Sequence, residues 1–204
     1  MIPSARYAFA FIVNVALPAA VYQIALPHFG VPGALAASAL PLLAWLGIDL
    51  VRYRHFDALS ALVLAGIVLS LLILATEPAR WLRDAREPLV SGVIGAFFLL
   101  SLPLERPLMF YLGRSTLSRE HSGREREFDR MWQDRPALVK SIRLMTVVWG
   151  VCLVAENAAR IWLTCCMAPE SGERLSLILR YATYAGLTAW TIVYRHRYLK
   201  RQPQ

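Results

Sequence analysis

The stretch LMTVVWGVCLVAENAARIWL, residues 144–163, decides the class of fold to which this chain belongs. An α-helix rises about 1.5 Å per residue, so about 20 residues cross a hydrocarbon core that is about 30 Å thick. This stretch has 20 residues and carries only two charged side chains, Glu156 and Arg160. It therefore predicts a membrane-spanning helix with two charged groups inside it.

Five further apolar stretches accompany this one, and together they predict an all-α, polytopic membrane protein. The chain is 57% hydrophobic and 18% charged, whereas soluble domains average about 45–50% and about 25%. Lipid offers the backbone no hydrogen-bond partners, and the alternating segments of barrel strands do not occur in the sequence, so helices are the expected solution. We expect six transmembrane helices in a single integral membrane domain, at residues 7–26, 32–51, 58–75, 89–104, 144–163 and 175–194. The fourth span is short, and the segment PLMFYL, residues 107–112, continues its apolar character.

The distribution of positive charge predicts the orientation of these spans. Sixteen of the 22 Lys and Arg residues fall at the N-terminus, in the second and fourth gaps between spans and in the C-terminal tail, against four in the other gaps. Basic gaps stay in the cytoplasm, so we expect a multi-pass protein of the bacterial inner (plasma) membrane with both termini cytoplasmic. The first span is expected to act as an uncleaved signal anchor. The net charge of +8 indicates contact with the cytoplasmic leaflet and not with nucleic acid.

Two connectors between the spans have an amphiphilic pattern. Residues 77–87 (EPARWLRDARE) predict a short interfacial helix on the outer face. Residues 106–143 form a charged cytoplasmic connector, in which Phe128, Met131 and Trp132 are expected to rest on lipid headgroups. A surface-lying helix is one interpretation of this connector, and an element that binds a partner is the other.

The last two spans carry a cluster of polar side chains at membrane depth. A charged group there costs about 2.5–3.5 kcal/mol on insertion scales, so it needs a partner or water. Glu156 and Arg160 are four residues apart on one helix face, and Arg180 and Tyr184 share a face of the next helix. We expect Glu156 to lie between the two arginines. The cluster is either an ion-pair network that fixes helix packing, or a net positive pocket that holds an anionic lipid headgroup or solute.

A second group of polar or helix-distorting residues is assigned to helix packing or gating. Asn14, Pro18 and Tyr22 lie on one stripe of the first span, and Asn157 follows Glu156 in the fifth. Pro18 frees a backbone carbonyl near Asn14, whose amide can satisfy it or bond to a neighbouring helix. Packing is one interpretation, and a kink that gates a substrate path is the other.

The chain offers no recognisable catalytic or metal-binding motif. The three cysteines and four histidines are scattered without metal-ligand spacing, and phosphate-binding, hydrolase and dinucleotide fingerprints do not occur in the sequence. We therefore predict no catalytic residues, no metal and no cofactor.

Four segments resemble the intracellular septation protein A family and its small inner-membrane relatives. They are LPAAVYQIA (residues 17–25), DLVRYRHFDAL (49–59), SLPLERPLMFYLGR (101–114) and RLMTVVWGVCLVAENAARIWL (143–163). The likeness extends over residues 7–197, but the connector 106–143 is longer than the compact one typical of the septation protein. The resemblance implies a non-enzymatic inner-membrane protein that serves cell-envelope maintenance or septation.

Four hypotheses about function follow. The first is an accessory or scaffold factor that contacts lipids and other envelope or division membrane proteins. The second is a small transporter or channel, as an oligomer, with Asn14, Glu156, Arg160 and Arg180 along its path. The third is a protein that binds anionic lipids. The fourth is an intramembrane enzyme, which ranks last because the sequence shows no converging set of catalytic groups.

Overall fold

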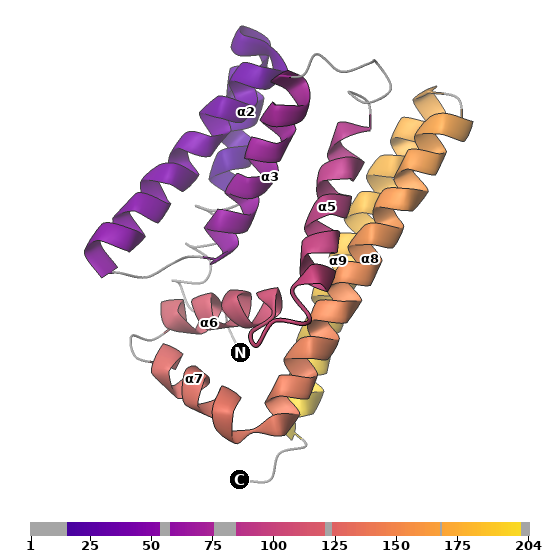
Figure 1. Cartoon of the computed structure of the whole chain (residues 1–204). Coiled ribbons are helices and arrows are strands. Elements are labelled where there is room, and N and C mark those ends of the chain that lie inside the picture. Colours follow the sequence, from indigo (N-terminus) through magenta and orange to yellow (C-terminus); the bar gives the residue numbers. More distant parts are fainter. Residues whose placement is uncertain (1–15, 54–57, 76–84, 121–123, 168, 201–204) are drawn as a thin grey trace.

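The computed structural model describes residues 16–53, 58–75, 85–120, 124–167 and 169–200. In this part of the chain the regular structure is entirely helical, as predicted, and seven helices are described (Figure 1). They are α2 (Leu17–Tyr53), α3 (Ala58–Ala75), α5 (Arg86–Leu100), α6 (Leu108–Glu120), α7 (Arg124–Asp134), α8 (Pro136–Cys166) and α9 (Pro169–Lys200).

Two of these helices, and not six, are long and apolar enough to cross a membrane by length and composition. They are Leu17–Ile48 within α2, and α8. The expected first span begins in residues 1–15, which lie outside the described part of the chain. The other expected spans fall short for different reasons: α5 has only 15 residues, the apolar part of α3 is Ser60–Ala75, and α9 mixes apolar with charged side chains.

Helix α2 contains the boundary that was expected between the first two spans. Its helical geometry is interrupted at Gly30, whose φ of 64° and ψ of −175° divide it into two helical arms. A positive φ is accessible to glycine without steric cost, and Pro32 removes a backbone donor just after the break. A Cβ on Gly33 would overlap with the Cβ of Phe29, so the turn leaves no room for a side chain at this position.

Helices α5 and α8 form the most extensive helix–helix contact, and glycines bring their backbones together. A Cβ on Gly95 would lie 2.8 Å from the Cβ of Leu153 and 3.0 Å from the carbonyl oxygen of Gly150. Small residues permit this close approach. Helix α9 packs along α8, and α3 joins this group to α2 (Figure 1).

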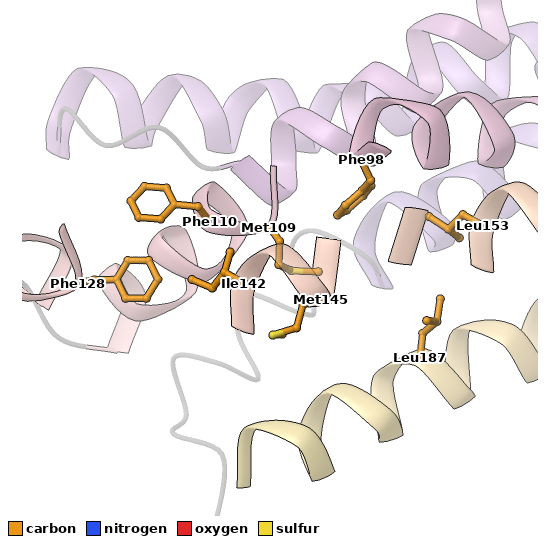
Figure 2. Close-up of a cluster of buried hydrophobic side chains, with 8 residues drawn as sticks. All are labelled: Phe98, Met109, Phe110, Phe128, Ile142, Met145, Leu153 and Leu187. Atoms are coloured by element: carbon orange, nitrogen blue, oxygen red, sulfur yellow. The ribbon is translucent and has the colours of Figure 1, made fainter. Parts of the chain in front are cut away.

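A hydrophobic core forms where α6 and α7 meet the lower part of α8 (Figures 1 and 2). Phe110 of α6 is fully buried, and its ring centroid lies 5.2 Å from that of Phe128 and 4.7 Å from that of Trp132, both on α7. The expectation that Phe128 rests on headgroups is therefore wrong, because its side chain is buried against α6. Burial of an aromatic pair gives more stabilisation than partial exposure at an interface.

The apolar segment 107–112, which was expected to extend the apolar character of the fourth span, is not a continuation of α5. The chain turns after Leu100, and α6 begins at Leu108 and runs across the direction of α5 (Figure 1). Ser101 fixes this turn, because its hydroxyl donates to the carbonyl of Phe98 at 2.7 Å and accepts from the backbone N–H of Leu108 at 2.9 Å. Arg143 of α8 donates to the carbonyl of Leu102 at 2.8 Å.

Candidate functional site

The polar cluster lies where α5, α8 and α9 meet, at the end of the bundle opposite α6 and α7 (Figure 1). Its centre is Glu156, which is 3% exposed. One carboxylate oxygen accepts a hydrogen bond from the hydroxyl of Ser91 at 2.9 Å, and the other accepts from Nη1 of Arg160 at 2.9 Å. The hydroxyls of Ser91 and Tyr184 lie 3.4 Å apart, so the network extends from α8 through α5 to α9.

Arg160 is nearly as buried as Glu156 and uses its guanidinium in three directions. Besides Glu156, its Nε donates to the hydroxyl of Ser176 on α9 at 2.7 Å, and its Nη2 lies 3.6 Å from Oε2 of Glu87 on α5. A planar group with five donors suits such a junction, whereas a lysine has one point of charge. Arg160 therefore connects all three helices.

Arg180 joins the cluster through Glu87 and not through Glu156. Its Nη1 donates to Oε2 of Glu87 at 2.6 Å, and its guanidinium lies over the ring of Tyr181, 5.1 Å from the ring centroid. Glu87 thus bridges the two arginines, in the position that the sequence analysis assigned to Glu156.

Glu87 was not among the expected site residues, because it falls at the end of the connector 77–87. The signal that would have found it is spacing: Glu87, Ser91 and Gly95 are four residues apart and share one face of α5. Since Gly95 is the point of close approach to α8, the carboxylate and hydroxyl on the same face also point toward α8. With Glu87 included, the two arginines of the cluster are matched by two carboxylates.

Two clefts adjoin the cluster. A polar cleft of about 890 Å³ lies between the beginning of α5, the end of α8 and the beginning of α9. Four arginines line it, against Glu87 and Glu173 as acidic residues; the arginines are Arg86, Arg160, Arg174 and Arg180.

The second cleft, of about 280 Å³, lies mainly between α3 and α5. Apolar side chains form most of its wall, and they include Leu62, Val63, Ile67, Val90 and Ile94. Glu87, Arg160 and Arg180 line both clefts, so the ion pairs form the boundary between a polar space and an apolar one.

The residues assigned to packing or gating lie in different places. Asn157 faces α5, where a Cβ on Gly92 would overlap with its side chain, and its buried Oδ1 has no hydrogen-bond partner in the described part of the chain. Pro18 is buried and Tyr22 half-buried in the first arm of α2, while Asn14 lies outside the described residues. The structure therefore brings together Glu156, Arg160, Arg180 and Tyr184, and it places Pro18 and Tyr22 on a different element.

In the described residues no group of three or more His, Cys, Asp or Glu side chains is arranged to hold a metal ion. The chemistry that the cluster offers is recognition of negative charge by guanidinium groups, next to an apolar surface. Comparisons with known proteins add nothing to this, since no family model, no curated protein and no solved structure matches the chain.

Proposed function

We propose that this chain is an integral, multi-pass protein of the bacterial inner membrane, with both termini in the cytoplasm. Large apolar side chains that are exposed on several helices support the proposal, because extensive exposed apolar surface marks a site of contact with a membrane or another protein. They include Ile24, Phe29 and Leu40 on α2, Val68 and Leu72 on α3, Val151 and Trp162 on α8, and Ile178 and Ile192 on α9.

The function that the geometry supports best is binding of an anionic lipid headgroup at the outer end of the bundle. The observation that carries it is the excess of arginine around the polar cleft, four guanidinium groups against two carboxylates. Arginine binds phosphate through paired N–H groups, and such charge-assisted hydrogen bonds are about twice as strong as neutral ones. The protein is non-enzymatic in this proposal and holds the lipid without altering it.

Native mass spectrometry of the protein, released from bilayers of equal parts phosphatidylglycerol and phosphatidylcholine, tests this function. Arg174→Ala and Arg180→Ala remove guanidinium groups from the cleft and are expected to lower retention of phosphatidylglycerol several-fold. Arg130→Ala, on the exposed surface of α7, is the matched control and is expected to retain the wild-type amount. Equal retention in all three variants would refute a headgroup site in this cleft.

A second candidate is an accessory or scaffold role in envelope maintenance or septation, through contacts with other membrane proteins. The packing of α6 and α7 favours it. Stacked Phe110 and Phe128 and the bond from Arg114 to Asp129, at 3.2 Å, join the two helices to each other, and the core that includes Ile142 and Met145 fixes them to α8. A rigid pair of charged helices at the cytoplasmic end would offer a constant surface to a partner. A photocrosslinker at exposed Gln133 is expected to capture a division or envelope-synthesis protein, and capture of lipid alone would argue against this role.

A further inference from the structure

Glu87 differs from the other carboxylate of the cluster in how it is held. Glu156 is buried and both of its oxygens accept hydrogen bonds from neighbours. The side chain of Glu87 is 53% exposed, and both of its contacts end on one oxygen, Oε2, at 2.6 Å from Arg180 and 3.6 Å from Arg160. Glu87 is therefore the carboxylate whose side chain can move out of the cluster without leaving a buried charge unpaired.

The place that Glu87 occupies has the features of a phosphate site. Two guanidinium groups from different helices converge on a single oxygen atom, Arg180 through a hydrogen bond and Arg160 as an ion pair, and a phosphate oxygen can replace the carboxylate oxygen in both contacts. Arg160 stays in position without Glu87, because Glu156 and Ser176 still hold its guanidinium. An anion that reached this point would find the site already formed.

The second cleft specifies what the anion is attached to. It begins at the same three side chains, Glu87, Arg160 and Arg180, and continues between α3 and α5 along an apolar wall. A free phosphate makes no favourable contact with that wall, whereas an acyl chain gains van der Waals contacts with its apolar side chains. The charge at one end and the apolar wall at the other fit an amphiphile.

We infer that one phosphate-headed lipid occupies both clefts, with its phosphate in the place of Glu87 between Arg160 and Arg180 and an acyl chain between α3 and α5. Glu87 acts as a competing anion that closes the site when no lipid is bound. This inference rests on the proposed function and adds to it the orientation of the lipid and the means by which the empty site is closed.

Binding of lysophosphatidic acid to the purified full chain in neutral detergent tests both halves of the inference. Glu87→Gln removes the competing charge and is expected to strengthen binding by about tenfold, the scale of one charge-assisted hydrogen bond. Glu173→Gln removes the same charge from the polar cleft without touching the arginine pair, and a smaller gain is expected there.

The predicted position of the acyl chain is tested at two glycines in apolar helices, Gly66 and Gly47. Gly66 lines the apolar cleft, and a Cβ there would lie 3.6 Å from both Val90 and Ile94, in ordinary contact, so Gly66→Leu adds a bulky side chain at the wall of the cleft. Gly47 has open space around it, so Gly47→Leu is the matched control. Gly66→Leu is expected to weaken binding several-fold and Gly47→Leu to leave it unchanged.

The outcomes separate this inference from the function on which it rests. Weaker binding in Arg180→Ala, with Glu87→Gln equal to Glu173→Gln and Gly66→Leu equal to Gly47→Leu, would keep the headgroup site and overturn the inference. Unchanged binding in Arg180→Ala would overturn both. Inorganic phosphate and lysophosphatidylcholine, which lack the chain and the net charge respectively, are expected not to compete, and competition by either would also overturn the inference.

Discussion

At the scale of single residues, the stability of the cluster depends on the pairing of Glu156 with Arg160. Both side chains are buried. Without Arg160, Glu156 would be a buried charge held by the hydroxyl of Ser91. Without Glu156, Arg160 would keep the more distant Glu87, at 3.6 Å, as its carboxylate. Breaking a buried pair by removing one partner costs about 3–5 kcal/mol, whereas replacing both by apolar groups is often nearly neutral. The pair therefore specifies the arrangement of α5, α8 and α9 more than it adds to their stability.

We predict that Glu156→Ala lowers the free energy of unfolding by about 3 kcal/mol, and that Glu156→Leu combined with Arg160→Met recovers most of this loss. Arg160→Lys is expected to lower the free energy of unfolding about as much as loss of the arginine side chain would, because an ammonium cannot reach Glu156, Ser176 and Glu87 together. Thermal unfolding in detergent micelles measures all three variants. A double variant less stable than Glu156→Ala would contradict this account of the pair.

The sequence was sufficient to identify Glu156 and Arg160 as partners, since they lie one helical turn apart in an apolar helix. It was not sufficient to identify Ser176 or Glu87 as theirs, because those contacts depend on the rotation of three helices about their axes. Phe128 shows the same limit: its partner Phe110 lies on another helix, and an amphiphilic pattern alone does not distinguish a core-facing side from a lipid-facing one.

At the scale of helices, the contact between α5 and α8 depends on glycines at the crossing. A Cβ on Gly95 would come within 3.0 Å of both Leu153 and the backbone of Gly150, and overpacking of this kind costs about 1–3 kcal/mol. We predict a loss of that size for Gly95→Ala. Gly186→Ala on α9, where a Cβ meets open space, is expected to be neutral or to stabilise by up to about 1 kcal/mol through helix propensity. Equal effects in thermal unfolding would contradict the close approach of α5 and α8.

The aromatic core of α6 and α7 gives a prediction for the connector 106–143. Phe128→Ala removes a buried ring from the contact with Phe110, at a cost of about 3–5 kcal/mol to this unit. We expect trypsin to cut the arginine-rich α7 many times faster in this variant than in the wild type. Gln133→Ala, at an exposed position on α7, is expected to leave the rate unchanged. Slow cutting of Phe128→Ala would mean that α7 is held by other contacts.

The helix boundaries show how much of each helix can be predicted from periodicity and hydropathy. The expected span 58–75 coincides with α3, and residues 144–163 and 175–194 fall within the longer α8 and α9. Hydropathy marks the part of a helix that suits lipid and not its full length, so both of these helices extend past the expected ends. The fourth span was placed at 89–104, but α5 runs from Arg86 to Leu100, since Pro103 lacks the backbone donor that another turn would need.

At the scale of the whole molecule, charge and apolar surface are arranged consistently with the proposed membrane topology. The α6–α7 pair lies at one end of the bundle, and the junction of α8 with α9 lies at the other (Figure 1). The basic connector and the polar cleft are thus separated along the length of α8, whose 31 residues rise about 46 Å at about 1.5 Å each. This length exceeds the thickness of a hydrocarbon core, about 30 Å.

Labelling of spheroplasts with a membrane-impermeant maleimide tests this topology most directly, because the chain carries its own probes. Cys165 and Cys166 are exposed at the end of α8 beside the polar cleft, and Cys152 is half-buried within α8. We predict that Cys165 and Cys166 react in intact spheroplasts, and that a cysteine at Gln133, in a chain with the native cysteines replaced by serine, reacts only after lysis. Reaction at Gln133→Cys before lysis, with Cys165 and Cys166 protected, would contradict the account.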